Sequence, residues 1–274
     1  MANVKKSNDS GADLGGIMTG IIILGCVFVG WIIWKFIMGS GSNFVGGINT
    51  GEPIPGNYLA MVYKGGPIVP VLIGCFLMVI VFSVERFMVI SKAAGKDSID
   101  KFMKKVQSNI ASNNIDAAIE DCDKQKGSVA NAIKAALLKH NEVKKEGMDS
   151  EAAAESISKE IEEATSLEMP MLEKHMTVLS TLVSLGTLAG LLGTVTGMIK
   201  AFAALAASGT PDSSALANGI SEALINTATG ISTSALAIVV YNYFTSKIDT
   251  LTYSIDEAGN TIVNTYRRFR GSLK

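Results

Sequence analysis

The chain has 274 residues, 48% of them hydrophobic, and a formal net charge of −1. Its mean hydropathy of +0.32 is too high for an ordinary soluble domain, yet 18% of the residues are charged and need water. The near-neutral charge gives no indication of a nucleic-acid partner. The three cysteines and two histidines are far apart in sequence, so they suggest neither a disulfide framework nor a metal site. No enzyme or cofactor-binding motif is visible.

Four apolar blocks are each long enough to cross the ~30 Å hydrocarbon core of a membrane as a helix. They cover residues 17–38, 67–90, 176–207 and 215–244. None shows the period-two alternation of a membrane β-strand. The sequence therefore predicts an all-α membrane protein, a transmembrane helix bundle whose long helices extend into a cytoplasmic helical domain.

The first block is open to two interpretations. Lys5 and Lys6 precede it, as in a secretion signal. However, its apolar stretch exceeds the ~7–15 residues of a signal-peptide core, and no A-x-A cleavage pattern follows. We expect an uncleaved transmembrane helix, and removal as a signal is the alternative. Residues 39–65, rich in Gly, Ser, Asn and Pro, then form a short outward-facing loop.

Basic residues are distributed unevenly between the connecting segments. Residues 91–175 hold 13 of the 24 lysines and arginines, whereas 39–65 holds only Lys64 and 207–213 holds none. Because positive charge concentrates in cytoplasmic loops, we assign 91–175 and both termini to the cytoplasm.

Amphipathic helices are expected within 91–175. Apolar residues recur on one helical face over 99–110 and again over 129–137, with Ser128 as the expected N-cap of the second helix. A third helix is expected to begin at Asp149 and to pass Pro170 with at most a kink. It should then run directly into the block at 176–207. We expect these helices to pack on one another as a bundle.

The last two blocks contain stripes of small residues and many hydroxyl groups. The stripes consist of Gly186, Gly190, Gly193 and Gly197 in one block and Gly219, Ala223, Thr227, Gly230 and Ser234 in the other. Lipid tails do not favour such residues, so the stripes indicate close contact between helices or subunits. A single Ser or Thr usually bonds back to the carbonyl four residues earlier. As a set, these hydroxyl groups indicate a wetted or partner-facing surface.

Glu222 is the only carboxylate within the last two blocks. A carboxylate in a bilayer is costly, faces protein or water, and commonly marks an ion pathway. The alternative is a residue that anchors the helix at the outer interface. Lys200, near the outer end of the preceding block, can extend to the lipid headgroups or pair with Glu222. Glu85 and Arg86 are expected to anchor the inner end of the second block.

The motifs of the last two blocks carry a family resemblance. Gly190-Leu-Leu-Gly-Thr-Val-Thr-Gly197, followed by Met198-Ile-Lys-Ala-Phe202, resembles the G-L-L-G-T-V-x-G-M-I-x-x-F signature of the ExbB/TolQ/MotA proton-channel family. Residues 220–230 resemble its I-A-E-A-L-x-x-T-A-x-G stretch, and residues 240–243 are similar to the end of its last span. The wording of the motifs is closest to ExbB.

The resemblance implies a subunit of a motor in the bacterial inner membrane that uses the proton motive force to energise TonB-dependent outer-membrane transport. It implies a pentamer of this chain around an ExbD- or TolR-like single-span dimer. A TonB-like protein and membrane lipids are further implied partners. Thr194 and Thr227 match positions that face the partner and line the proton pathway, and Glu222 matches one nearer the outer side. Additional pore or interface candidates are Lys200, Asn226, Gly190, Gly197 and Gly230.

The span at 17–38 departs from the three-span layout of ExbB and TolQ, and four spans resemble the flagellar stator subunit. The sequence therefore does not decide whether the chain serves an ExbB-, TolQ- or MotA-like motor. It also does not decide whether the motor uses protons or sodium ions. Two rivals are a non-conducting scaffold, which does not explain the polar stripes, and a secondary transporter, which would show internal repeats.

The expected organisation begins with an N-terminal tail and the extra span (1–45), a periplasmic loop (46–66), a span (67–90) and the cytoplasmic helical domain (91–175). It continues with a span (176–207), a periplasmic turn (208–213), a span (214–245) and a cytoplasmic C-terminal helix (246–274).

Overall fold

The computed structural model describes residues 10–208 and 213–271. The expected roles of Lys5 and Lys6, and most of the expected turn at 208–213, lie outside these residues. Within them, helices dominate, and the one extended pairing is an isolated bridge between Phe44 and Pro53. Four helical stretches are long and apolar enough to cross a membrane. The prediction of an all-α membrane protein is confirmed.

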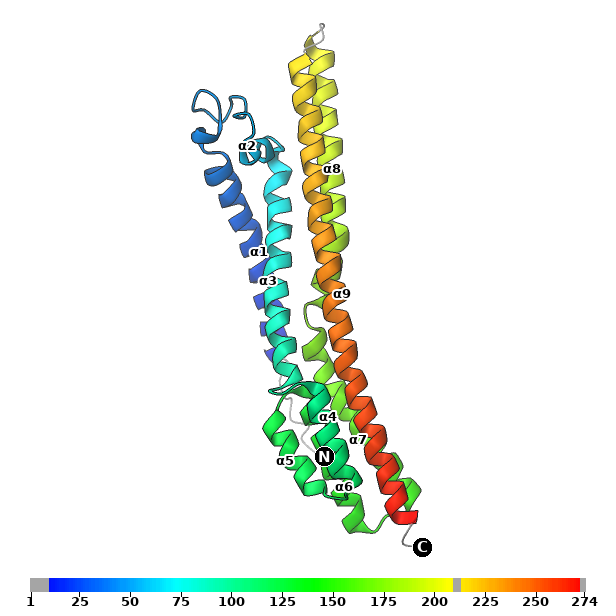
Figure 1. Ribbon diagram of the computed structural model, residues 1–274. Coiled ribbons are helices and arrows are strands. Elements are labelled where there is room, and N and C mark those ends of the chain that lie inside the picture. Colours follow the sequence, from blue (N-terminus) through cyan, green and yellow to red (C-terminus); the bar gives the residue numbers. More distant parts are fainter. Residues whose placement is uncertain (1–9, 209–212, 272–274) are drawn as a thin grey trace. The chain divides into compact units, whose positions relative to one another are not determined.

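The helices differ greatly in length (Figure 1). The longer ones are α1 (Ser10–Ile32), α3 (Val69–Ala94), α4 (Ile99–Ala111), α5 (Ile115–Gln125), α6 (Ser128–Glu146), α7 (Ser150–Glu173), α8 (Met176–Ser208) and α9 (Ser213–Gly271). The short ones are η1 (Ile33–Met38), η2 (Gly41–Asn43), α2 (Tyr58–Tyr63) and η3 (Gly66–Ile68).

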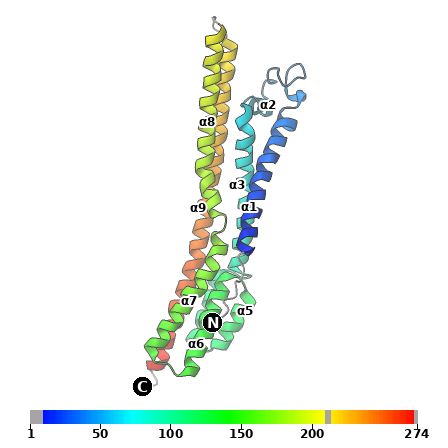
Figure 2. The ribbon, with the colours of Figure 1, turned by 180° about the vertical axis from the view of Figure 1, so that it is seen from behind.

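The described residues form two compact units. The first contains the residues up to Ser83 together with Val178–Val240, and the second contains Val84–Thr177 and the residues from Tyr241 onward. In the first unit α8 and α9 run side by side (Figures 1 and 2). Many apolar side chains on their outer surfaces are exposed, among them Leu188 at 61% and Leu224 at 65%. Such a surface suits a lipid environment.

The extra N-terminal helix packs against α3 in the first unit. A Cβ added at Gly30 would lie 2.6 Å from the carbonyl oxygen of Pro70, and one added at Gly74 would lie 2.9 Å from the Cα of Val27. The two backbones therefore touch, as at other small-residue crossings. After α1, the Trp34 ring of η1 stacks on the Tyr63 ring of α2, with 4.8 Å between the ring centroids. This contact packs α2 against η1.

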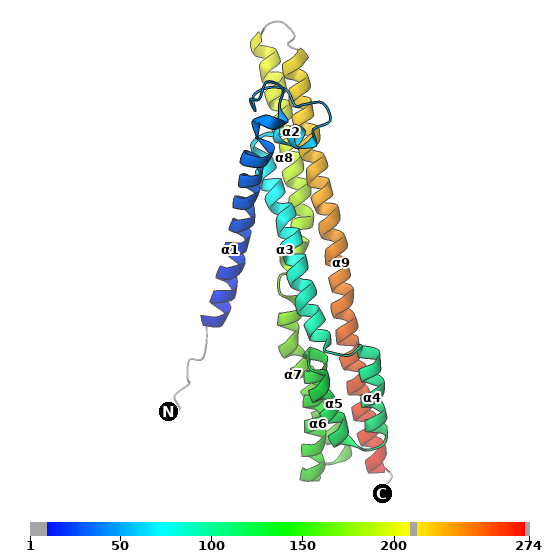
Figure 3. The ribbon, with the colours of Figure 1, turned by 60° about the vertical axis from the view of Figure 1, so that its left-hand side comes forward.

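The second unit packs α4 to α7 against the C-terminal part of α9 (Figure 3). The apolar face expected over 99–110 is buried, and so is the face expected over 129–137. Polar and aromatic contacts tie this bundle to α9. Among them are Gln107 with Glu257 at 3.2 Å, Arg267 with Glu151 at 2.7 Å, and the rings of His140 and Tyr266 at 5.1 Å. The prediction that these amphipathic helices pack on one another as a bundle is confirmed.

One local prediction in this segment is wrong, and one helix was not predicted. Ser128 is not an N-cap, because α6 begins at Ser128 itself and the N-cap is Gly127, whose φ of +89° suits glycine. The helix α5 was not predicted, because acidic residues interrupt its apolar face. One of them, Asp121, is buried and accepts hydrogen bonds from Lys105 and Asn109 of α4.

The third expected helix does not continue into the next span. It begins after Asp149 as predicted and passes Pro170, but α7 ends at Glu173 and α8 begins at Met176. The buried Arg86 of α3 donates hydrogen bonds to the carbonyl oxygens of Met171 and Leu172, both at 3.1 Å. In a continuous helix those carbonyls would accept from residues 175 and 176. His175 instead adopts a φ of +64°.

Candidate functional site

Glycines bring α8 and α9 into backbone contact along a seam in the first unit. A Cβ added at Gly230 would lie 2.5 Å from the carbonyl oxygen of Gly186 and 2.8 Å from the Cα of Gly190. One added at Gly197 would lie 3.0 Å from the carbonyl oxygen of Gly219. A larger side chain at these positions would force the helices apart. The small-residue stripes therefore meet each other within the chain.

Thr194 and Thr227 form a hydroxyl pair across this seam. Their Oγ1 atoms are hydrogen-bonded to each other. Thr194 Oγ1 also lies 3.3 Å from the carbonyl oxygen of Gly190, and Thr227 Oγ1 lies 3.2 Å from that of Ala223. Each hydroxyl has one proton and can also accept, so the bond between the two can run in either direction. Both side chains are half-buried, which leaves them partly accessible to a partner.

Asn226 lies in the same seam and is fully buried. Its Nδ2 atom donates to the carbonyl oxygen of Gly65 at 2.8 Å, and its side chain fills the space left by Gly193. Its Oδ1 atom is buried without a hydrogen-bond partner in the described part of the chain. Gly65 was not among the predicted site residues. The Gly65-Gly66-Pro67 sequence before the second span was the available signal, since such a sequence predicts a turn.

Glu222 and Lys200 are brought together at one end of the seam. Lys200 Nζ lies 2.6 Å from Glu222 Oε1. The Glu222 side chain is 13% exposed and that of Lys200 is 54% exposed, so the glutamate is the more buried member of the pair. Gly66 has a φ of +80°, and a side chain there would collide with the Glu222 carboxylate. The pairing that the sequence left open is therefore present.

The other hydroxyl groups divide into two kinds. Thr229, Ser232 and Thr233 donate back to the carbonyl four residues earlier at 2.8–2.9 Å, which is the ordinary arrangement in a helix. Thr187 instead donates across the seam to Ser234 at 2.9 Å. The cross-helix hydroxyl contacts are thus concentrated where the two glycine stripes meet.

The geometry orders the polar groups along α9. Thr227 follows Glu222 by five residues, which is about 7.5 Å along a helix. A carboxylate accepts or releases a proton, and paired hydroxyls can both donate and accept. The seam therefore holds side chains that can donate and accept protons. Among the described residues no cluster of three or more His, Cys, Asp or Glu side chains could hold a metal ion.

A helical chain with four helices long and apolar enough to cross a membrane is a multi-pass membrane protein, and this one carries a polar, glycine-lined seam. Residues 124–257 match the sequence model of the MotA/TolQ/ExbB proton channel family, and this region contains the whole seam. This part of the chain is therefore similar to that family. The helix α1 lies outside the matched region.

Several curated proteins are also similar to the chain. The putative biopolymer transport protein ExbB-like 3 of Synechocystis is 32% identical over 40% of this chain and 53% of its own length. The Tol-Pal system protein TolQ of Pseudomonas aeruginosa is 34% identical over 38% of this chain and 46% of its own. The biopolymer transport protein ExbB of Xanthomonas campestris is 29% identical over 40% and 46%. The chain spans about half the length of these curated relatives.

Proposed function

We propose that this chain is the proton-channel subunit of an inner-membrane motor that uses the proton motive force to energise TonB-dependent outer-membrane transport. The observation that carries the proposal is the Thr194–Thr227 hydroxyl pair, held in a glycine-lined seam within the region that matches a proton channel family. The chain works as a homopentamer around an ExbD-like single-span dimer. Both termini and residues 91–175 face the cytoplasm.

In this mechanism the partner's carboxylate carries the proton past the seam. Protons enter from the outer side near the Glu222–Lys200 pair and reach the partner carboxylate opposite the two threonines. Within the pair one hydroxyl donates to the other, which donates its own proton in a hydrogen bond to the ionised carboxylate and stabilises it. Protonation removes most of the cost of placing the carboxylate in an apolar environment, so the partner helix can step to the next subunit. Two helices within a fivefold ring turn such steps into rotation.

The first test removes the hydroxyl groups and keeps the shape of the site. In cells that lack the native gene, the Thr194→Val, Thr227→Val double variant should lose proton-driven transport, while the same amount of assembled complex is purified. The Thr194→Ser, Thr227→Ser double variant retains both hydroxyl groups and should keep most of the activity. Normal transport in the valine variant would show that proton-driven transport does not need the two hydroxyl groups.

The second test determines what assembles. The full chain is co-expressed with an ExbD-like single-span protein from the same organism and analysed by native mass spectrometry. The proposal predicts five copies of this chain with two partner chains. A monomer or dimer that retains no carboxylate-bearing partner would favour a scaffold or a transporter.

A TolQ-like role in envelope maintenance is the second candidate, and the similarity to the Pseudomonas TolQ favours it. The two roles differ in their deletion phenotype. A TonB-system subunit is needed for energised uptake across the outer membrane. A TolQ-like role in envelope maintenance instead predicts that deletion weakens the envelope, measured as sensitivity to detergents, and leaves uptake intact.

A further inference from the structure

A pocket in the second unit lies where α3, α4 and α9 meet, and the proton pathway does not use it. Its volume is about 350 Å³, within the range of about 300–1,000 Å³ typical of small-molecule sites. Its walls come from the ends of the predicted spans and from the residues just beyond them. The lining residues are Phe87, Ile90, Ser91, Ala94, Ile99, Asp100, Tyr243, Phe244, Lys247, Thr250 and Leu251.

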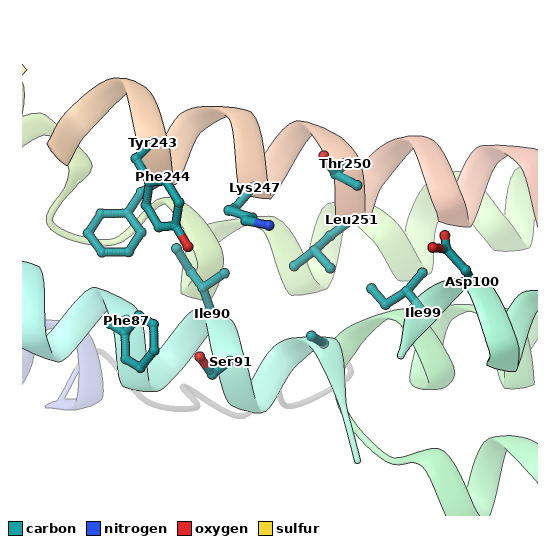
Figure 4. A pocket seen from close by; sticks show the side chains of 11 residues that line it. Phe87, Ile90, Ser91, Ile99, Asp100, Tyr243, Phe244, Lys247, Thr250 and Leu251 are labelled. Carbon is teal, nitrogen blue, oxygen red and sulfur yellow. The ribbon is translucent and has the colours of Figure 1, made fainter. Parts of the chain in front are cut away.

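The polarity of the pocket changes along its length (Figure 4). Phe87, Tyr243 and Phe244 form an aromatic end, Lys247 lies in the middle, and Asp100 lies at the opposite end. Phe87 and Tyr243 are 58% and 50% exposed, so the aromatic end is open to its surroundings. Since the predicted spans end at residues 90 and 245, that end reaches the hydrocarbon and the charged end reaches the cytoplasmic headgroup region.

We propose that this pocket binds a phospholipid of the inner leaflet whose headgroup carries a phosphate followed by a primary ammonium, as in phosphatidylethanolamine. The order of groups in that lipid is acyl chain, phosphate and ammonium. The order in the pocket is aromatic wall, Lys247 and Asp100, so each group of the lipid meets a side chain of suitable character. The assignment rests on the proposed cytoplasmic side of residues 91–175, not on proton conduction.

The side chains present favour a zwitterionic headgroup over a purely anionic one. Lys247 Nζ lies 5.8 Å from the centroid of the Tyr243 ring, so its ammonium group lies just beyond the aromatic end, in the middle of the pocket, where the phosphate of the lipid would sit. Thr250 donates its proton to the carbonyl oxygen of Ser246 at 2.8 Å, so its hydroxyl is available chiefly as an acceptor. An anionic headgroup would bring Asp100 no positive partner and would repel it.

Native mass spectrometry of the full-length chain tests this proposal directly. The purified protein is offered equal amounts of dioleoyl-phosphatidylethanolamine and dioleoyl-phosphatidylglycerol. The wild type should retain one phosphatidylethanolamine per chain. Lys247→Gln should weaken retention about tenfold, as expected for one lost charge-assisted hydrogen bond. Asp100→Asn should abolish the preference for phosphatidylethanolamine and leave lipid binding in place.

Matched controls keep the result specific to the pocket. Lys92→Gln and Asp97→Asn remove the same charges at exposed neighbouring positions outside the lining, and they should bind as the wild type does. Ala94→Leu fills the pocket without changing its charge and should reduce lipid retention.

Three results would overturn the proposal. The first is equal retention of both lipids by the wild type. The second is equal behaviour of Lys247→Gln and Lys92→Gln. The third is an intact oligomer of wild-type chains that retains no lipid, which would assign the pocket to a neighbouring copy. None of the substituted residues lies in the α8–α9 seam, so failure here would leave the proton-channel proposal untouched.

Discussion

Thr194 of α8 and Thr227 of α9 hydrogen-bond to each other across the seam between the helices. If the two hydroxyl groups act as one relay, loss of either should stop it. Thr194→Val, Thr227→Val and the double variant should therefore lose proton-driven transport to the same extent. Transport rates of the three variants and the wild type form a double-mutant cycle that checks this. Single losses that multiply in the double variant would mean that the threonines act independently.

The glycine seam predicts a stability effect. A Cβ at Gly230 would meet only backbone atoms of α8, which cannot rotate away. Gly230→Ala should therefore destabilise the fold by about 1–3 kcal/mol. Thermal unfolding in detergent would show a lower midpoint. The matched control is Gly25→Ala in α1, where a Cβ would meet no atom within 4 Å and the midpoint should stay the same or rise. Equal effects would show that α8 and α9 do not touch at the seam.

Replacement of Arg86 should reduce the stability of the fold more than the Gly230→Ala change does. Its guanidinium is 1% exposed, bonds the carbonyl oxygens of Met171 and Leu172, and is paired with Glu85. Arg86→Met leaves these acceptors unpaired and should cost about 3–5 kcal/mol. Arg86→Lys keeps the charge but not the planar fork, so its effect should be intermediate. The exposed Lys92 of the same helix gives the control Lys92→Met, with little expected change. Similar unfolding midpoints for Arg86→Met and Lys92→Met would show that Arg86 does not stabilise the end of α7.

His140 predicts a pH dependence of stability. Burial lowers the pKa of His140 below its usual 6.5. A hydrogen bond with Asn141 opposes this shift in part, and the charge of Lys144 adds a smaller lowering. The unfolded chain therefore binds more protons than the folded chain below pH 6.5, so stability falls as the pH drops from 6.5 toward the lowered pKa. The slope approaches about 1.4 kcal/mol per pH unit.

Thermal midpoints at pH 7.5, 6.5 and 5.5 measure this slope. The variant His140→Leu lacks the titrating group and keeps His175, so its midpoint should vary less with pH than that of the wild type. An identical pH dependence in both proteins would assign the effect to another group.

Much of the fold could be predicted from local patterns. The length of the apolar blocks gave the four membrane-capable helices, and the helical spacing of apolar residues over 99–110 gave the buried face of α4. The glycine spacing indicated close helix contact. In each case the physical cause lies within a few neighbouring residues, so one sequence is sufficient to see it.

The features that could not be predicted depend on residues distant in sequence. Asn226 bonds to Gly65, 161 residues away, through a turn whose position no local pattern gives. The break between α7 and α8 depends on Arg86 of α3, 85 residues before Met171. The Lys200–Glu222 contact joins two helices whose register is set by the glycine seam. The roles of Thr194, Thr227 and Glu222 came from family resemblance and remain proposals.

Proton flux across a membrane that contains the purified complex tests the central claim most directly. The chain and its single-span partner are reconstituted into liposomes loaded with a pH-sensitive dye, and a proton gradient and membrane potential are imposed. The account predicts internal acidification with the wild type and with the Thr194→Ser, Thr227→Ser variant, and flux near that of empty liposomes with the Thr194→Val, Thr227→Val variant. Wild-type flux in the valine variant would contradict the claim that these hydroxyl groups carry the proton pathway.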